Sequence, residues 1–135
     1  MTAPVSTQPP DQHQPIAIRL HRRSRVLELE YAGGERHSLS CEYLRVYSPS
    51  AEVLGHGPGQ EVLQTGKQHV AITQIKPVGN YALQLVFDDG HDTGLYSWTY
   101  LYELGQTRET RWQEYLARLE AAGASRDPDV QVLKL

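Results

Sequence analysis

Cysteine is nearly absent from this chain, and its scarcity excludes several classes of protein. Cys41 is the only cysteine among 135 residues, so no disulfide can form within the chain. We therefore expect a protein of the reducing cytoplasm rather than a disulfide-stapled secreted domain. Long apolar runs are absent too, and none approaches the ~20 residues that span a bilayer. The N-terminal residues also lack the basic and apolar regions of a signal peptide.

An excess of positive charge is missing as well. Thirteen Lys and Arg residues against 16 Asp and Glu give a formal net charge of −3, which argues against a nucleic-acid partner. Catalytic motifs are equally scarce. The glycines of 55–59 do not fit G-x-G-x-x-G, Ser48 and Ser50 lack a G-x-S-x-G context, and no H-E-x-x-H occurs. We therefore expect no enzyme.

The chain does contain a pattern that occurs twice, over residues 16–47 and 70–104. Ile18 corresponds to Ile72 in this pattern. Period-two alternation and Gly-rich turns predict hairpins, and a serine before each following segment predicts a capped short helix. The fold should be α+β and mainly β, with two repeated β-β-β-short-helix units. The expected strands are 16–22, 26–31, 36–40, 70–76, 80–87 and 91–96, and the expected short helices are 41–47 and 98–104.

Three further regions complete the predicted organisation. Residues 107–122 form one amphipathic helix, because Trp112, Tyr115, Leu116 and Leu119 share a face. Residues 1–15 carry four prolines and read as a disordered arm. We expect a single domain over 16–123 and a C-terminal tail over 124–135, in which 130–135 either adds an edge strand or frays.

The segment 48–69, inserted between the two copies, is where function is expected. It holds four of the 11 glycines, and loops of this length are usually functional or disordered. His56 lies among glycines that allow close approach of a ligand. His91 follows the acidic turn Asp88-Asp89-Gly90. Either histidine has two interpretations, as a zinc or iron ligand or as a residue satisfied by its own loop.

Three stretches together resemble a known family: Tyr43-Leu44-Arg45-x-x-Ser48-Pro49-Ser50, Asp88-Asp89-Gly90-His91 and Ser97-Trp98-x-Tyr100-Leu101. They are similar to the small domain at the N-terminus of gamma-butyrobetaine hydroxylase and to its free-standing bacterial versions, over roughly residues 15–106. In the hydroxylase, three cysteines and the histidine of this turn bind a structural zinc. The cysteine positions fall on Ser48, Ser50 and Val53 here. Only His91 remains, so the resemblance implies that the zinc site is lost.

The resemblance also implies what the domain does. The hydroxylase chemistry belongs to a separate oxygenase domain, and a similar small domain ends some Mrp-type iron–sulfur scaffold ATPases. We therefore expect a non-catalytic accessory domain with a protein partner and no cofactor, linked by analogy to iron–sulfur protein maturation. The alternatives are a metal-binding module using His91 and His56, or a small-metabolite enzyme or binder. The predicted interaction surface comprises Ser48, Pro49, Ser50, Glu52, His56, Gly57, Asp89, His91 and Trp98.

Overall fold

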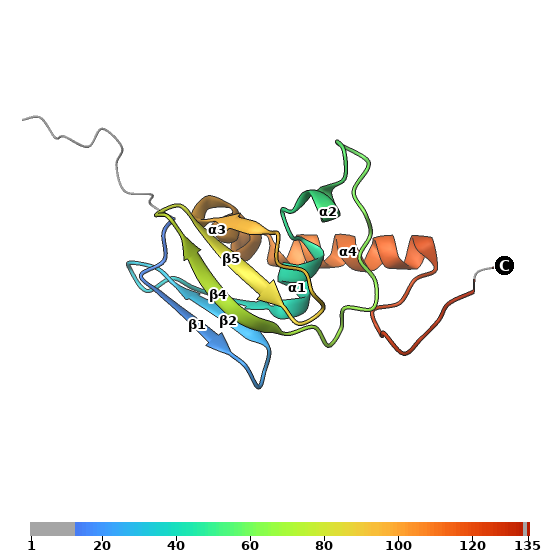
Figure 1. The fold of residues 1–135 in the computed structure, drawn as a ribbon, viewed down its shortest axis with the longest axis horizontal. Helices are drawn as coiled ribbons and strands as arrows, with labels where there is room; N and C mark the ends of the chain where they lie inside the picture. The colour runs from blue at the N-terminus through green and yellow to red at the C-terminus, as the bar shows by residue number, and fades with distance from the viewer. Residues whose placement is uncertain (1–12, 134) are drawn as a thin grey trace, which may run out of the picture.

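Each half of the chain forms a three-stranded antiparallel sheet that runs into a helix (Figure 1). The computed structural model describes residues 13–133 and 135. The first sheet has the order β1-β2-β3 and the second the order β4-β5-β6. The strands are β1 Ala17–His21, β2 Val26–Glu30, β3 Arg36–Ser40, β4 Ile72–Val78, β5 Ala82–Phe87 and β6 Leu95–Ser97. The helices are α1 Cys41–Val46, α2 Ala51–Leu54, α3 Trp98–Gln106 and α4 Arg108–Ala122. The predicted α+β class and the C-terminal helix are confirmed.

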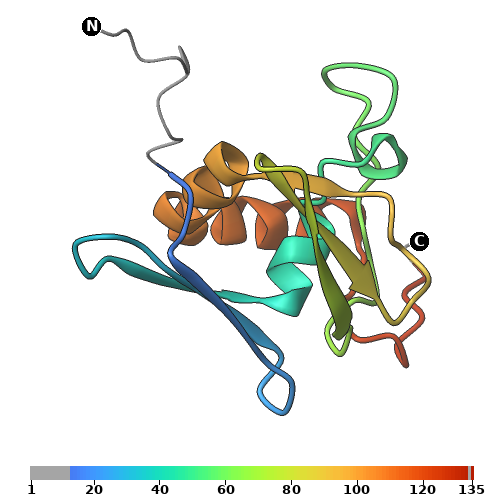
Figure 2. The same ribbon diagram turned by 60° about the vertical axis from the view of Figure 1, so that its left-hand side comes forward.

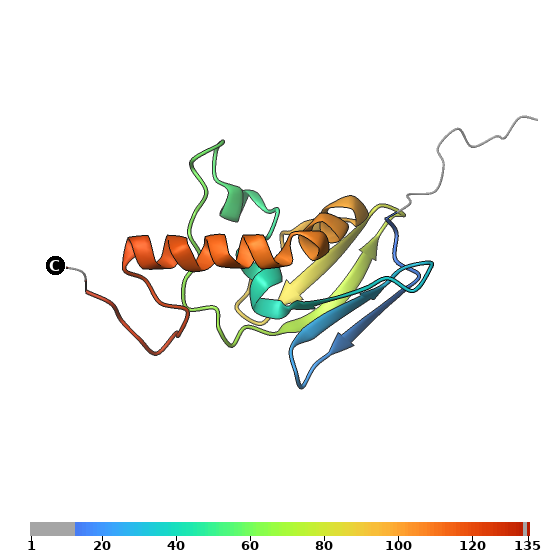
Figure 3. The same ribbon diagram turned by 180° about the vertical axis from the view of Figure 1, so that it is seen from behind.

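The two sheets share one hydrophobic core. Alternate residues of β2 and β5 point into it, and Leu27, Leu29 and Leu85 have no exposed surface. Such alternation is what a half-buried strand requires. The helices α3 and α4 lie behind the sheets in Figure 1 and in front of them in Figure 3. From α4, Tyr115 and Leu119 pack in a second, smaller cluster with Val46 of α1.

Serine caps begin both repeat helices, as predicted. The Ser40 hydroxyl accepts from the backbone N–H of Tyr43, and the Ser97 hydroxyl accepts from that of Tyr100. Each cap satisfies one of the backbone donors left free at a helix start. At its other end, α4 terminates at Gly123, whose φ of 63° is left-handed. In Figure 2 the hairpins β1-β2 and β4-β5 lie side by side, and α1 lies between this pair of hairpins and α4.

Tyrosine hydroxyls tie the two halves together reciprocally. Tyr43 of α1 donates to the carbonyl of Leu104 near the end of α3, at 2.7 Å. Tyr100 of α3 donates to the carbonyl of Tyr47 just after α1, at 2.6 Å. Carbonyls at a helix end have no partner within their own helix, so each half supplies donors to the other.

Several predicted boundaries were wrong. The strand expected at 91–96 is reduced to β6, since His91 turns inward to a buried hydrogen-bond network. Pro77 lies inside β4 rather than in a turn, which is tolerated because β4 is an edge strand. Gly105 lies inside α3 instead of ending it. A Cβ at Gly105 would lie 2.6 Å from Cγ of His37, so close packing explains this glycine.

The chain ends are only partly described. Most of the predicted arm lies outside the described residues, which begin at 13. In the C-terminal tail, residues 130–133 and 135 form no strand. No helix in the described part of the chain is both long and apolar enough for a membrane crossing.

Candidate functional site

A partly buried hydrogen-bond network joins the segment after α1 to the connection between β5 and β6. Ser48 Oγ lies 2.8 Å from His91 Nε2, and His91 Nδ1 lies 2.9 Å from Glu52 Oε1. Ser50 Oγ lies 2.7 Å from the Thr93 hydroxyl, which donates to Glu52 Oε1 at 2.8 Å. We call these five residues the clamp. The structure thus brings together two stretches that the family resemblance suggested would be close.

Local backbone chemistry places the clamp residues. The Ser50 hydroxyl caps α2 by accepting from the N–H of Glu52, and the N–H of Ser50 donates to Ser48 Oγ at 3.2 Å. A Cβ at Gly94 would lie only 2.5 Å from Ser48 Oγ. Only glycine at this position lets the start of the β6 region cover Ser48. The hydroxyl is consequently sealed, and Ser48 has no exposed surface.

An ion-pair group fixes the turn next to the clamp. Asp89 Oδ2 accepts from Arg45 Nε at 2.8 Å and from Lys67 Nζ at 2.6 Å, while Oδ1 accepts from the N–H of His91 at 3.1 Å. Burial alone would raise the pKa of Asp89, but the three donors outweigh it and hold this pKa at about 2. Asp89 is therefore ionised at any physiological pH. Arg45 Nη1 is buried and has no hydrogen-bond partner among the described residues.

The environment of His91 favours its neutral form. Burial lowers the pKa of His91 and the charge of Arg45 lowers it further, against the opposing influence of Glu52 and Asp89. A carboxylate can only accept, so Nδ1 carries the proton and donates to Glu52. The remaining nitrogen, Nε2, accepts from the Ser48 hydroxyl. Both ring nitrogens are thereby used within the clamp.

The connectivity Ser48–His91–Glu52 is that of a nucleophile, a general base and an orienting acid. Two features oppose acyl transfer at this place. Ser48 is fully buried, and the following residue, Pro49, has no N–H to hold an oxyanion. The N–H of Ser48 itself donates to the carbonyl of Arg45 at 3.3 Å. The arrangement suits a structural joint between two segments.

The same geometry does not suit a zinc ion of the kind that the resemblance implies for the hydroxylase domain. The positions of the cysteines hold Ser48, Ser50 and Val53, none of which supplies a thiolate. Both nitrogens of His91 already have hydrogen-bond partners. In the part of the chain that the structure describes, no three His, Cys, Asp or Glu side chains are grouped so that they could hold a metal ion. Hydrogen bonds of Ser48 and His91 occupy the place at which the resemblance implies metal bonds in the hydroxylase domain.

The second predicted ligand, His56, is not brought to His91. It is exposed in the loop after α2, beside a shallow depression formed with Leu54 and Pro58. No hydrogen bond or ion pair joins it to His91 within the described ranges. The indole of Trp98, predicted on the interaction surface, is 5% exposed and donates to the carbonyl of Asn80. Its ring belongs to the core.

The residues of the predicted interaction surface therefore fall into two groups, a buried set and an exposed rim. Ser48, Ser50 and His91 lie beneath, each at most 6% exposed. The side chain of Glu52 is 62% exposed, and Gly57 belongs to the protruding loop. Sequence reasoning missed Thr93 and Lys67, because an isolated threonine or lysine in a loop carries no pattern.

A groove of about 330 Å³ adjoins this rim and was also missed. Its floor includes Tyr47 and Tyr100, one wall comes from α2 and the loop after it, and the other comes from α4. The α4 side carries Arg111, Glu114 and Arg118. The sequence did contain one signal for this groove. Arg111, Glu114 and Arg118 are spaced i, i+3, i+7, which places three charged residues on one stripe of the helix.

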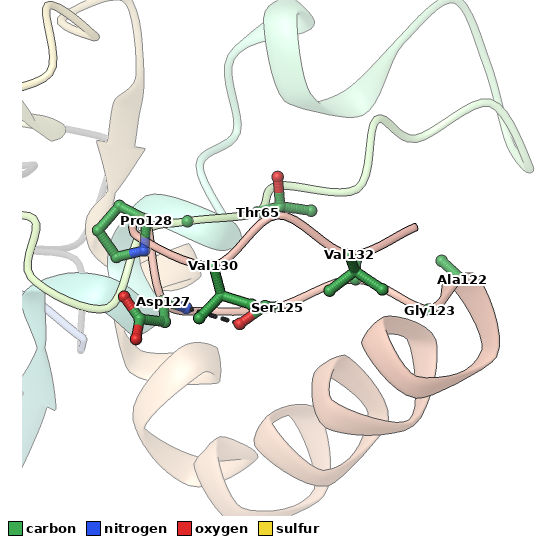
Figure 4. A pocket seen from close by; sticks show the side chains of 10 residues that line it. Thr65, Ala122, Gly123, Ser125, Asp127, Pro128, Val130 and Val132 are labelled. Atoms are coloured by element: carbon green, nitrogen blue, oxygen red, sulfur yellow. Dashed lines mark hydrogen bonds between the residues drawn. The ribbon is translucent and has the colours of Figure 1, made fainter. Parts of the chain in front are cut away.

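A second depression, of about 320 Å³, lies where the chain leaves α4 (Figure 4). The N–H of Gly66 donates to the carbonyl of Ser125 there, and the N–H of Gln68 donates to that of Arg126. Val130 and Val132 project beside this junction, about half exposed. Among the described residues that line this depression, Asp127 is the one charged side chain.

Comparison with known proteins gives a consistent result. The family model described as gamma-butyrobetaine hydroxylase-like, N-terminal, matches residues 18–102. No match was found among curated proteins. One solution NMR structure is 54% identical with a TM-score of 0.76, and the match covers 90% of this chain and 95% of the other. A second NMR structure is 51% identical with a TM-score of 0.73, covering 100% and 98%.

A crystal structure from Acidithiobacillus ferrooxidans is also similar. It is a protein of unknown function of the DUF971 family, 41% identical with a TM-score of 0.58. The match covers 73% of this chain and 98% of that protein. The described fold is therefore that of a domain which also occurs as a chain of its own.

Proposed function

The chain belongs to the gamma-butyrobetaine hydroxylase-like N-terminal family, and on that premise we propose that it is a non-catalytic accessory domain that binds a protein partner. The contact surface in this proposal is the exposed side of 51–62, which we call the arch. The arch comprises α2 and the loop that returns from it. The supporting observation is the clamp, which fixes the base of the arch from below.

Because the arch is held in place, its exposed apolar side chains are presented at fixed positions. Leu54 is 46% exposed and Val62 is 52% exposed, although both sit beside a well-packed core. The N–H of Val62 donates to the carbonyl of Val53 at 2.8 Å, so the two sides of the arch are held together. A preformed surface binds with less loss of conformational entropy than a mobile loop. Exposed apolar groups on a rigid support are typical of interaction sites.

The partner in this proposal is an iron–sulfur scaffold protein. Support comes from the resemblance to the small domain at the end of some Mrp-type scaffold ATPases. We also propose that the domain works in the cytoplasm. Support comes from the cysteine content, since one cysteine cannot form a disulfide within the chain. Cys41 is 1% exposed, and burial raises the pKa of its thiol, so it is an unreactive core residue.

The proposal is tested by binding of the immobilised chain to a purified Mrp-type scaffold ATPase, with and without an assembled cluster, in bio-layer interferometry. We expect micromolar binding that weakens at least tenfold in the double variant Leu54→Glu, Val62→Glu. A matched control replaces two exposed apolar residues outside the arch, Tyr81→Glu and Leu95→Glu, whose exposed fractions are 58% and 46%. This control should bind like the wild type.

Two outcomes contradict different parts of the proposal. If neither form of the scaffold binds the wild type, the link to iron–sulfur proteins is wrong. If the scaffold binds the Leu54→Glu, Val62→Glu variant as tightly as the wild type, the arch is not the contact surface. Circular dichroism and the urea midpoint establish that both double variants are folded.

A further inference from the structure

The groove between the arch and α4 is lined by apolar and aromatic side chains, with Glu61 of the arch and the charged residues of α4 beside them. Val53 and Leu54 line it from the arch, and Tyr47 and Tyr100 line it from the body of the domain. At about 330 Å³ it has room for two or three apolar side chains but not for a folded domain. A partner must therefore insert a narrow element.

The α4 wall of the groove carries charges that are not neutralised within the described part of the chain. Glu114 and Arg118 are four positions apart, a spacing that commonly gives an ion pair on a helix. Neither forms a hydrogen bond or ion pair with any residue from 13 to 133. Both side chains belong to exposed residues on the groove rim.

Arg111 is held in place but also lacks a carboxylate partner in the described ranges. Its Nε donates to the Thr107 hydroxyl at 2.7 Å. Its guanidinium carbon lies 5.5 Å from the ring centroid of Tyr47 and 5.9 Å from that of Tyr100. Stacking over two aromatic rings fixes the cation at one end of the groove. The structure thus presents a positioned cation there and a second cation, Arg118, two helical turns away.

The spacing of these charges indicates the shape of the partner. Seven residues of α-helix rise about 10.5 Å, so the Cα positions of Arg111 and Arg118 are separated by about that distance. A partner helix repeats the same face at the same interval. An extended strand repeats a face every ~6.8 Å, so its side chains on one face cannot align with both arginines at once. Charge complementarity then requires acids opposite the arginines and a base opposite Glu114.

We propose that this groove binds an amphipathic helix of a partner protein, with an apolar stripe flanked by two acidic residues seven positions apart. The apolar stripe enters between Leu54 and Tyr47, and the acidic residues pair with Arg111 and Arg118. A lysine or arginine between those acids pairs with Glu114. This inference rests on the proposed function, because it specifies the chemistry of the partner at the arch. Helix-in-groove binding uses anchors at the same i, i+3, i+4, i+7 positions.

The test uses two synthetic 16-residue helical peptides with an identical leucine stripe. One carries glutamates seven apart with a lysine between them, and the other carries the reversed charges. Each is titrated into the ¹⁵N-labelled full chain and followed by amide chemical shifts. We expect shifts confined to residues of the arch and of 111–118, and at least tenfold tighter binding of the acidic peptide. The double variant Arg111→Glu, Arg118→Glu should prefer the reversed peptide.

A matched charge-reversal control separates this site from net charge. Arg23→Glu, Lys76→Glu makes the same change of charge at exposed residues that do not line the groove. It should retain the preference for the acidic peptide. Equal binding of both peptides, shifts outside the groove, or the same loss of preference in the control overturns the inference. If the peptides fail while scaffold binding still depends on Leu54 and Val62, only this inference falls. If the acidic peptide binds as expected and no scaffold does, the inference stands and the iron–sulfur link falls.

Discussion

The hydroxyl of Ser48 and Nε2 of His91 are 2.8 Å apart, although 43 positions separate the two residues in the chain. This contact joins the end of the first β-β-β-helix unit to the turn that precedes β6. In the related hydroxylase domain, the resemblance implies a metal at this junction. Here a neutral histidine with two occupied nitrogens supplies the same connection. We expect the arch and its groove to depend on this joint for their position.

Removing the histidine should weaken the whole fold. His91→Ala removes the acceptor of the Ser48 hydroxyl and one of the two donors to the Glu52 carboxylate, and it opens a small cavity. We expect a loss of about 2–4 kcal/mol in the free energy of unfolding, from the unpaired polar groups and the cavity together. Urea denaturation at pH 7.5 measures it. The control His21→Ala removes a half-exposed histidine and should change stability by less than about 0.5 kcal/mol.

The close approach at Gly94 gives a second prediction. Alanine at this position would place its Cβ 2.5 Å from Ser48 Oγ, so either the hydroxyl or the backbone must move. We expect Gly94→Ala to cost about 1–3 kcal/mol by overpacking. Gly57→Ala is the control, because nothing lies within 4 Å of its added Cβ. A Gly94→Ala protein as stable as Gly57→Ala would show that the Ser48 site is loosely packed.

The stability of the domain should fall in mildly acidic solution because of His91. Its folded pKa lies below the ordinary value of 6.5, so the unfolded state binds more protons as the pH falls below that value. The stabilising contribution is complete above about pH 6.5 and is lost as the pH falls toward the folded pKa. Urea midpoints at pH 7.5 and 5.5 test this. The decrease in urea midpoint between pH 7.5 and pH 5.5 should be smaller in His91→Gln than in the wild type. In His21→Gln it should equal that of the wild type.

The contribution of Asp89 to the stability of the domain should change over a lower pH range than that of His91. Its folded pKa of about 2 lies below the ordinary 3.8, so its contribution is complete above about pH 4 and is lost as the pH falls toward 2. Asp89→Asn removes both ion pairs and should destabilise the protein at pH 7. At pH 2 the variant and the wild type should have nearly the same thermal midpoint. A difference that persists at pH 2 would mean that asparagine perturbs the turn by another route.

Restoring the thiolates should restore a metal site. The triple variant Ser48→Cys, Ser50→Cys, Val53→Cys places three cysteines at the positions that the family resemblance assigns to zinc ligands, next to His91. We expect close to one zinc per chain by atomic absorption and an increase in thermal midpoint on zinc addition. Adding His91→Ala to this background should weaken zinc binding at least tenfold. Zinc content unaffected by His91→Ala would indicate a site made elsewhere.

Sequence reasoning predicted the elements whose signals are local and missed the features that depend on distant partners. The alternation in β2 and β5, the serines that cap α1 and α3, and the apolar stripe of α4 are all readable over a few residues. The course of 91–94 is not, because it is set by the contact of His91 with Ser48 across 43 positions. Gly105 shows the same limit, since its role depends on His37 in another element.

The candidate site divides in the same way. The Asp-Asp-Gly-His turn drew attention to His91 because acids and glycine beside a histidine form a visible motif. Thr93 and Lys67 acquire their roles only from the fold, by hydrogen bonds to Glu52 and Asp89. The pairing of His56 with His91 was suggested by residue type alone, and nothing in the glycine-rich loop directs His56 toward the clamp.

The reciprocal tyrosine bonds have a consequence for how the protein assembles. The carbonyl of Tyr47 depends on Tyr100 from the second half, and that of Leu104 depends on Tyr43 from the first. Neither half can therefore complete its own helix end. A chain cut between Gly57 and Pro58 should yield two fragments that are each unstructured alone and recover the native spectrum when mixed. We therefore expect the two halves to unfold in one cooperative transition rather than as two small domains in series.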